Sequence, residues 1–188
     1  YDDVFVSLAG RYQIDNASTA LCALEVLRRE CGVILERDAV LNGLAFARHA
    51  ARLEKICDEP LVIIDGAHNA EGMEAFCGSI RSFIRGRRTL LILGILKDKE
   101  LAKMLSSALS LGVDIALSEP ENPRKASDRD LLEILESLGG HAALLGDAAH
   151  AWDYAMGHKD QYDCFLFAGS LYFVSAIREQ CMAGKEKK

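Results

Sequence analysis

From residue 61 to residue 182, short apolar runs alternate with longer stretches in which apolar residues recur every three or four positions. The runs have the length of buried strands, and the recurring spacing is that of amphipathic helices. Strands that alternate with helices in this way predict βαβ units and a mostly parallel sheet with helices on both faces. The expected strands are 61–65, 89–94, 113–118, 142–145 and 163–168, and the expected helices are 71–85, 99–111, 127–138, 147–157 and 171–182.

The first fifty residues follow a different pattern. Helical spacing extends over 12–31 and stops at Gly32, a residue suited to the left-handed conformation that ends many helices. A second helical pattern covers 36–48, with no strand between the two. Residues 51–57 alternate polar and apolar positions, which predicts an edge strand, and Asp58-Glu59-Pro60 ends it.

Composition excludes several classes of function. The chain has 188 residues, 50% of them hydrophobic, and a net charge of −6. It has no Lys/Arg-dense arm, so neither nucleic acid nor an anionic membrane is expected as a partner. No apolar run reaches the length of a transmembrane helix.

The cysteines indicate a reducing compartment. The sequence contains no C-x-x-C pair, and most of its cysteines fall in apolar patterns. This favours reduced core thiols over a disulfide framework or a zinc site, and a cytoplasmic location. The six are Cys22, Cys31, Cys57, Cys77, Cys164 and Cys181.

The most informative stretch is 61–72, LVIIDGAHNAEG. An apolar strand pattern ends at Asp65, and a turn with His68 and Asn69 leads into a helix. Ligands of open α/β sheets bind beyond the carboxyl ends of the strands, where these polar groups are expected. The first N–H groups of the following helix also favour an anionic ligand such as phosphate or carboxylate.

Four motifs in order carry a family resemblance. Residues 65–69, DGAHN, resemble the motif of that sequence in the folylpolyglutamate synthase and dihydrofolate synthase family of the Mur ligase superfamily. Residues 11–17, RYQIDNA, resemble its H/R-x-Q-x-x-N-A helix, and 51–54, ARLE, resemble its G-R-L/F-E segment. Together with GSLY at 169–172, the match covers nearly the whole chain. The resemblance implies a Rossmann-like, doubly wound α/β domain of the Mur ligase C-terminal type.

Enzymes of this family also carry a phosphate-binding loop, G-x-x-x-x-G-K-[ST], which this sequence lacks. We therefore expect the chain to be the C-terminal part of a larger ligase. In that interpretation residues 1–50 are a remnant of the central ATPase domain with its linker, 51–184 are the Rossmann-like ligase domain, and 185–188 are a frayed tail. The missing ATPase domain is expected as a partner and as the carrier of the Mg²⁺ ligands, with no metal site in this chain.

The resemblance implies that Asn16, Arg52 and Asp65 bind ATP. A carboxylate at Asp65 accepts hydrogen bonds from ribose hydroxyls, although capping the next helix is the alternative. A guanidinium at Arg52 binds phosphate oxygens, although a surface ion pair with Glu54 or another nearby acid is the alternative. The carboxamide of Asn16 suits an adenine edge or ribose, although it shares a helical face with Gln13 and these two amides can bond each other.

The resemblance also places His68 and Ser170 as catalytic residues in the interdomain cleft. His68 lies near the reacting carboxyl phosphate and the incoming amino acid in this interpretation, or is simply a turn residue. Ser170 lies near the glutamate site, and it is equally suited to cap the helix that follows. Arg124, in an N-P-R segment similar to that of related Mur ligases, is a candidate for binding the carboxylate of the amino acid. Asn69 is expected to hold the turn.

The implied activity is an ATP-dependent ligation of L-glutamate to a folate or dihydropteroate carboxylate through an acyl phosphate. Two alternatives stay open. One is another Mur-type amino-acid ligase of peptidoglycan synthesis, against which Gly66 counts, because those enzymes tend to have Tyr or a similar residue between the Asp and the Ala of this motif. The other is a non-catalytic nucleotide-binding or interaction module of the same fold.

Overall fold

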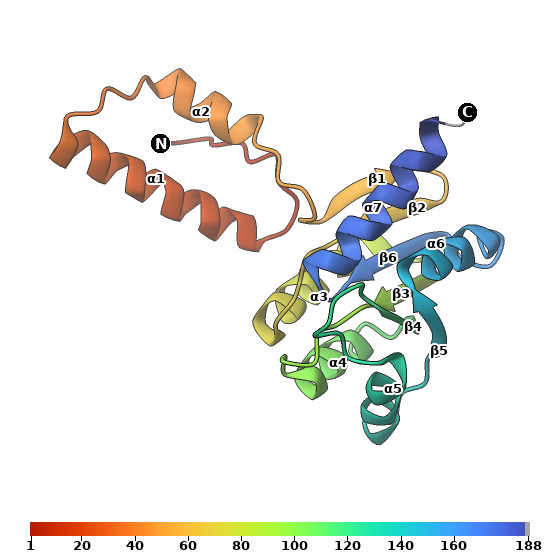
Figure 1. Cartoon of the computed structure of the whole chain (residues 1–188). Helices are drawn as coiled ribbons and strands as arrows, with labels where there is room; N and C mark the ends of the chain where they lie inside the picture. Colours follow the sequence, from red (N-terminus) through yellow and green to blue (C-terminus); the bar gives the residue numbers. More distant parts are fainter. Residues whose placement is uncertain (187–188) are drawn as a thin grey trace. The chain divides into compact units, whose positions relative to one another are not determined.

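The computed structural model describes residues 1–186, which form two compact units, Tyr1–Ala50 and the part of the chain from Ala51 onward. The second unit contains a six-stranded sheet with the strand order β1-β2-β6-β3-β4-β5 (Figure 1). β1 is antiparallel to β2, and the remaining neighbours are parallel. The predicted α/β class with a mostly parallel sheet is confirmed. The strands are β1 (Glu54–Cys57), β2 (Leu61–Ile64), β3 (Thr89–Leu93), β4 (Asp114–Glu119), β5 (Ala143–Asp147) and β6 (Cys164–Ala168).

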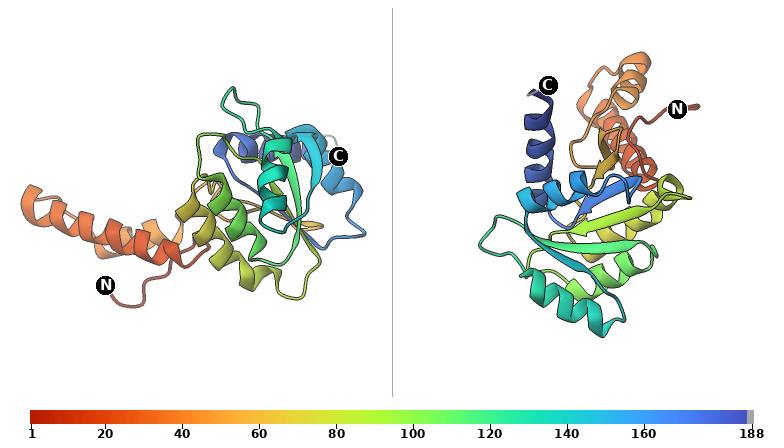
Figure 2. Two further views of the ribbon diagram at one scale, coloured as in Figure 1. Left: turned by 90° about the horizontal axis from the view of Figure 1, so that it is seen from below. Right: turned by 90° about the vertical axis from the view of Figure 1, so that its right-hand side faces the viewer.

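The helices of the second unit cover the sheet on both faces. α3, α4 and α5 pack side by side on one face, and α6 and α7 pack on the other (Figure 2). Two opposed helical layers explain why β3 and β6 are buried along their whole length. The helices are α3 (Ala70–Ile84), α4 (Leu101–Leu109), α5 (Asp128–Ser137), α6 (Ala148–Gly157) and α7 (Leu171–Glu186).

The position of β6 determines where a ligand site forms. β6 pairs with β2 through Ile64 and Phe167 and with β3 through Leu91 and Leu166. β2 and β3 are consecutive in sequence but not adjacent in the sheet, because β6 lies between them. Such a change of direction in strand order opens a crevice at the carboxyl ends of the strands. The turns after β2 and β6 leave the sheet at this edge.

Aromatic side chains fill the layer between the sheet and α6 and α7. Phe165, Phe167 and Phe173 are fully buried. The ring of Phe167 lies 6.1 Å from that of Phe173 and 6.3 Å from that of Trp152, both within the range of favourable aromatic contact. The start of α7 is thus fixed firmly against β6.

Residues 51–53 form a turn, so the prediction of a strand over 51–57 is wrong for its first three residues. Ala51 has a φ of 56° and Leu53 a φ of 44°, whereas strand residues have strongly negative φ. The physical reason is a set of hydrogen bonds to this turn from residues far along the chain, which the local alternation of polar and apolar residues does not reveal. β1 begins only at Glu54.

The first unit is mostly helical, as its sequence predicts. α1 (Tyr12–Cys31) ends at Gly32, which has a φ of 65° and donates its N–H to the carbonyl of Leu27. α2 covers Arg37–Ala45. The Ser7 hydroxyl donates to the carbonyl of Ala47 over 2.7 Å and ties the N-terminal segment to the chain after α2.

The predicted frayed tail, 185–188, is only partly described by the structure. Residues 185 and 186 belong to α7, whereas 187–188, also part of the predicted frayed tail, lie outside the described residues. Within residues 1–186 no helix combines the length and apolarity needed to cross a bilayer.

All six cysteines are free thiols, but their environments differ. Cys77, Cys164 and Cys181 are buried, as expected of core thiols. Burial raises the pKa of Cys77 to about 12 and that of Cys164 to about 11. Cys22 and Cys31 are exposed on α1, so the expectation of core thiols does not hold for these two.

Thiol labelling is expected to separate these two groups. At about pH 8 the Cys77 and Cys164 thiols are protonated and shielded, so they should resist iodoacetamide until the protein unfolds. Cys22 and Cys31 should be modified in the native chain. Peptide mass spectrometry before and after urea treatment measures the difference, and native labelling of Cys77 at the rate of Cys22 would contradict the burial described.

Candidate active site at the carboxyl edge of the sheet

Asp65 is the central group of the turn after β2. Its N–H donates to the Phe167 carbonyl over 2.9 Å, and its side chain is buried, with 1% of the residue exposed. Oδ2 accepts the Leu53 N–H and Oδ1 accepts the Ala67 N–H, both at 2.8 Å. The carboxylate therefore joins the turn after β2 to the turn before β1.

Asn69, and not Asp65, caps α3. Asn69 Oδ1 accepts the Gly72 N–H over 2.8 Å, in the geometry of an N-cap residue. The capping alternative for Asp65 is wrong, and the expectation that Asn69 holds the turn agrees with this contact. The contact of Asp65 with ribose stays a prediction.

Gly66 allows three segments to meet. Its N–H donates to the Ala51 carbonyl over 2.6 Å. A Cβ at Gly66 would lie 2.4 Å from Cδ2 of Leu171, the first residue of α7, and 3.2 Å from the Ala51 oxygen. A larger residue here would require the Leu171 side chain to move, and its Cβ would lie in tight contact with the Ala51 carbonyl.

His68 is half-buried in the same turn. Its Nδ1 lies 2.9 Å from the Gly66 carbonyl oxygen. Because a carbonyl only accepts, Nδ1 carries the proton in this contact, and Nε2 of the neutral ring is then an acceptor. This tautomer suits a group that receives a hydrogen bond or a proton from a ligand.

Ser170 follows β6 and directly precedes α7. Its Oγ accepts the Phe173 N–H over 3.1 Å, so the capping interpretation is correct, and the residue is 1% exposed. Because β2 and β6 are adjacent and parallel, the turns with Ser170 and His68 leave the same edge of the sheet. Their catalytic roles stay predictions.

Arg124 lies beside the loop that follows β3. Its carbonyl accepts the Lys97 N–H over 2.8 Å, and its Nη1 lies 3.3 Å from Oδ2 of Asp98. The guanidinium is exposed at the edge where β3 and β4 end. Next to it, Lys125 forms an ion pair with Glu119 and lowers the pKa of that carboxyl. Arg124 is thus accessible to a carboxylate, which would compete with Asp98 for it.

Asn16 lies in the first unit. Its Nδ2 donates to Oε1 of Gln13 over 2.9 Å, so the two amides bond each other as the alternative interpretation has it. Gln13 is buried and Asn16 is exposed. The ATP contact of Asn16 stays a prediction.

Arg52 occupies the middle of the turn before β1, where it is half-buried. The side chain of Glu54 pairs with Arg178 of α7, with 3.1 Å between Arg178 Nε and Glu54 Oε1. The alternative of an ion pair between Arg52 and Glu54 is therefore wrong. Sequence reasoning missed Arg178 because 124 residues separate the partners.

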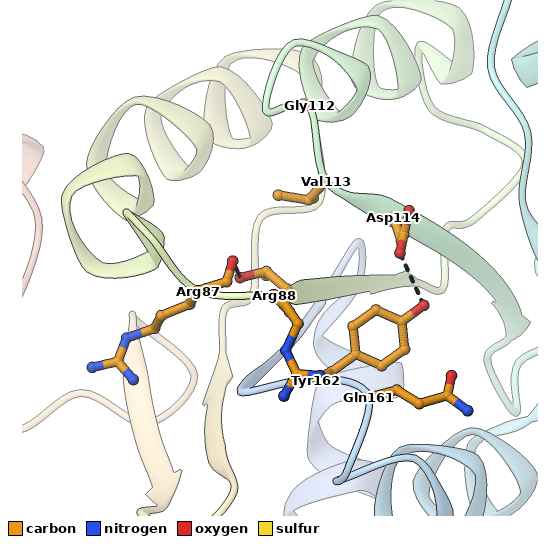
Figure 3. Close-up of a pocket in the computed structure, with 8 residues that line it drawn as sticks. Arg87, Arg88, Gly112, Val113, Asp114, Gln161 and Tyr162 are labelled. Atoms are coloured by element: carbon orange, nitrogen blue, oxygen red, sulfur yellow. Dashed lines mark hydrogen bonds between the residues drawn. The ribbon is translucent and has the colours of Figure 1, made fainter.

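A hollow at the opposite, amino edge of the sheet has a volume of about 370 Å³ (Figure 3). The Tyr162 hydroxyl donates to Asp114 over 3.0 Å, and burial raises the pKa of Tyr162 to about 12. Arg88 is bound to Asp163 and holds the pKa of that carboxyl at about 2. These polar groups pair with one another, and none of the motif residues lies in this hollow.

Comparison with known proteins identifies the family. The family model described as "Mur ligase, glutamate ligase domain" matches residues 51–171. The chain belongs to the Mur ligase family. Its second unit contains the matched glutamate ligase domain, and the turns with Arg52, Asp65 and Ser170 all lie within the match.

Individual relatives of this Mur ligase domain confirm the resemblance read from the four motifs. The dihydrofolate synthase/folylpolyglutamate synthase of Escherichia coli is 33% identical over 87% of this chain and 37% of that protein. The protein of the same description from Bacillus subtilis is 29% identical over 96% of this chain and 41% of its own length. The chain thus spans about two fifths of these relatives.

A solved structure gives the same result for the fold. The structure of E. coli FolC in complex with DHPP and ADP matches with a TM-score of 0.84 and 29% identity. The match covers 98% of this chain and 42% of that one. The predicted domain type is therefore confirmed, whereas the role of each site residue is not tested by this likeness.

Proposed function

We propose that this chain works as part of a longer ATP-dependent ligase that adds L-glutamate to a folate or dihydropteroate carboxylate. The observation that carries the proposal is the pairing of β2 with β6 in a glutamate ligase domain. This pairing brings the DGAHN turn and the Gly169-Ser170 turn to one edge of the sheet. Relatives with dihydrofolate and folylpolyglutamate synthase descriptions, and a neighbour solved with ADP, support it.

The proposed reaction has two steps. An oxygen of the pterin carboxylate attacks the γ-phosphorus of ATP, and ADP leaves, which gives an acyl phosphate. The α-amine of glutamate then attacks the acyl carbon, phosphate leaves with the C–O bond electrons, and the amine loses its proton. Water must be kept from the acyl phosphate, because hydrolysis would waste it.

On the nucleotide side, we propose that Arg52 binds phosphate oxygens and offsets the charge that develops during transfer. Asp65 is proposed to accept from ribose hydroxyls. Asn16 is proposed to bind adenine or ribose from the first unit.

On the amino-acid side, His68 and Ser170 are proposed to lie at the reacting centre. The Nε2 acceptor of His68 suits the ammonium or amine of glutamate. Arg124 is proposed to bind a glutamate carboxylate in exchange for its contact with Asp98. The shared edge of β2, β6, β3 and β4 is the physical basis for this grouping.

We propose that the Mg²⁺ ion of the reaction is bound outside this chain. Residues 1–186 contain no group of three or more His, Cys, Asp or Glu side chains arranged to hold a metal ion. The Asp65 carboxylate already accepts two backbone N–H groups. The Mg²⁺ ligands are proposed to lie on the part of the ligase that carries the phosphate-binding loop, and the steps above use none from this chain.

Isotope transfer tests the acyl phosphate. The complete ligase is supplied with ATP, glutamate and a pterin substrate labelled with ¹⁸O in its carboxylate. The proposed chemistry moves a labelled oxygen from the carboxylate into the released phosphate, which mass spectrometry detects. Unlabelled phosphate accompanied by amide product would exclude this intermediate.

The 188-residue chain alone is expected to neither hydrolyse ATP nor ligate glutamate. Its sequence has no G-x-x-x-x-G-K-[ST] loop to hold the phosphates during transfer. Phosphate release and glutamylated product are measured with the purified chain, and Arg52→Ala serves as a control for contaminating enzymes. Turnover by the chain that the Arg52→Ala variant loses would contradict the expectation.

A further inference from the structure

Arg52 lies between two residues in an unusual backbone conformation. Ala51 has a φ of 56° and Leu53 a φ of 44°. L-residues with side chains rarely adopt this left-handed region, because Cβ approaches the neighbouring carbonyl. Such conformations persist only where the surrounding structure holds them, and they concentrate at functional sites.

Three hydrogen bonds hold this turn. The Ala51 N–H donates to Oε2 of Glu54 over 2.8 Å, and the Ala51 carbonyl accepts the Gly66 N–H over 2.6 Å. The Leu53 N–H donates to Oδ2 of Asp65 over 2.8 Å. Both strained residues are therefore fixed by a carboxylate.

Arg178 of α7 orients one of these carboxylates. Its Nε donates to Oε1 of Glu54 over 3.1 Å, while Oε2 of Glu54 accepts the Ala51 N–H. The Glu54 carboxylate thus links α7 to the turn, and its side chain is only 25% exposed. Partial burial keeps such a pair from being fully screened by solvent.

The three residues of the turn differ in burial. Ala51 and Leu53 are 6% and 7% exposed and anchor the turn against the domain, whereas Arg52 between them is only half-buried. The residues on each side of Arg52 are therefore packed into the domain, whereas Arg52 itself keeps exposed surface. Such a turn restricts the directions that a long side chain can take.

We propose that Arg178 is a positioning residue. Through Glu54, and together with Asp65, it holds Ala51 and Leu53 in the left-handed conformation and so orients Arg52, which lies between them, toward its ligand. The nature of that ligand, a nucleotide phosphate, rests on the proposed function. Glycine reaches positive φ without the penalty of a side chain, so the Arg178–Glu54 pair is needed mainly because position 51 is Ala.

Steady-state kinetics of the complete ligase tests this proposal. Arg178→Met removes the guanidinium but keeps much of the side-chain volume. It should raise the KM for ATP about tenfold, because a small misplacement of a binding group is costly, with a smaller change in kcat. Glu54→Gln should also raise the KM for ATP. Arg178→Lys, which keeps the positive charge, should have a KM for ATP between those of the parent and Arg178→Met. It replaces Arg178→Met in this test if the Met variant folds poorly.

The decisive comparison uses Ala51→Gly as a second background. There the Arg178→Met effect on the KM for ATP should shrink to less than about threefold, since the turn no longer needs the same support. Arg88→Met, which breaks an exposed ion pair at the other edge of the sheet, is the matched control and should leave this KM unchanged. An equal Arg178→Met effect in both backgrounds would overturn the proposal.

Arg52→Ala separates this proposal from the proposed function. If Arg52→Ala raises the KM for ATP and Arg178→Met does not, Arg178 is no positioning residue. If Arg52→Ala has no effect on ATP, the phosphate role of Arg52 fails instead. Hydrogen exchange of the peptide covering 51–53 then decides: faster exchange in Arg178→Met supports the holding of the turn, and unchanged exchange overturns it.

Discussion

Arg52→Ala in the complete ligase is expected to lower kcat/KM for ATP by about a hundredfold. Removing a fixed charged donor from a site where negative charge develops costs about this much. The free energy of unfolding should change little, because the side chain of Arg52 is half-exposed and the turn is held through the backbone of its neighbours. Initial rates over a range of ATP concentrations and a urea titration measure the two quantities.

Two variants sharpen the interpretation of this result. Arg52→Lys should recover only part of the activity, since an ammonium lacks the bidentate geometry of a guanidinium. Arg124→Ala should raise the KM for glutamate and leave that for ATP unchanged, if the two arginines serve different substrates. A loss of stability in Arg52→Ala with unchanged ATP kinetics would show that Arg52 has a structural role instead.

Gly169→Ala is expected to lower the free energy of unfolding by about 3 kcal/mol. Gly169 has a φ of 114°, and a Cβ there would lie 2.7 Å from the Gly94 carbonyl oxygen. Gly94 also donates its N–H to the Ala168 carbonyl over 3.0 Å, so the two backbones cannot separate cheaply. Urea denaturation followed by circular dichroism measures the change.

Gly78→Ala is the matched control. Gly78 lies on the exposed side of α3, and a Cβ there would meet no atom within 4 Å. Alanine is the better helix former by about 1 kcal/mol, so this variant should be as stable as the parent or more so. Equal stabilities of Gly169→Ala and Gly78→Ala would contradict the close approach of β3 and the turn after β6.

The sequence predicts the parts of the fold that depend on local periodicity. Apolar runs such as 89–94 and 163–168 mark buried strands because both faces of the sheet are covered. The end of the first helix at Gly32 was also predictable from the sequence, since the left-handed conformation there favours Gly. The apolar run that ends at Asp65 likewise predicted that the DGAHN turn follows a strand.

Other features depend on partners distant in sequence. The alternation at 51–57 indicated a strand, but the Asp65 carboxylate and the Gly66 N–H impose a turn on its first residues. Capping of α3 by Asp65 was open in the sequence, because Asp commonly caps helices, and only the contact of Asn69 with the Gly72 N–H excludes it. Arg178 carries no local signal at all, as its partner lies on the edge strand of the sheet.

An ATP-dependent ligation assay measures the proposed activity itself. The complete ligase is incubated with ATP, L-glutamate and either dihydropteroate or a reduced folate, and a peptidoglycan precursor carrying a free carboxylate serves as the comparison substrate. We expect a pterin product extended by glutamate, with ADP and phosphate released in equal amounts. Glutamate transfer to the peptidoglycan precursor alone, or no ATP-dependent amide product with either pterin, would contradict it.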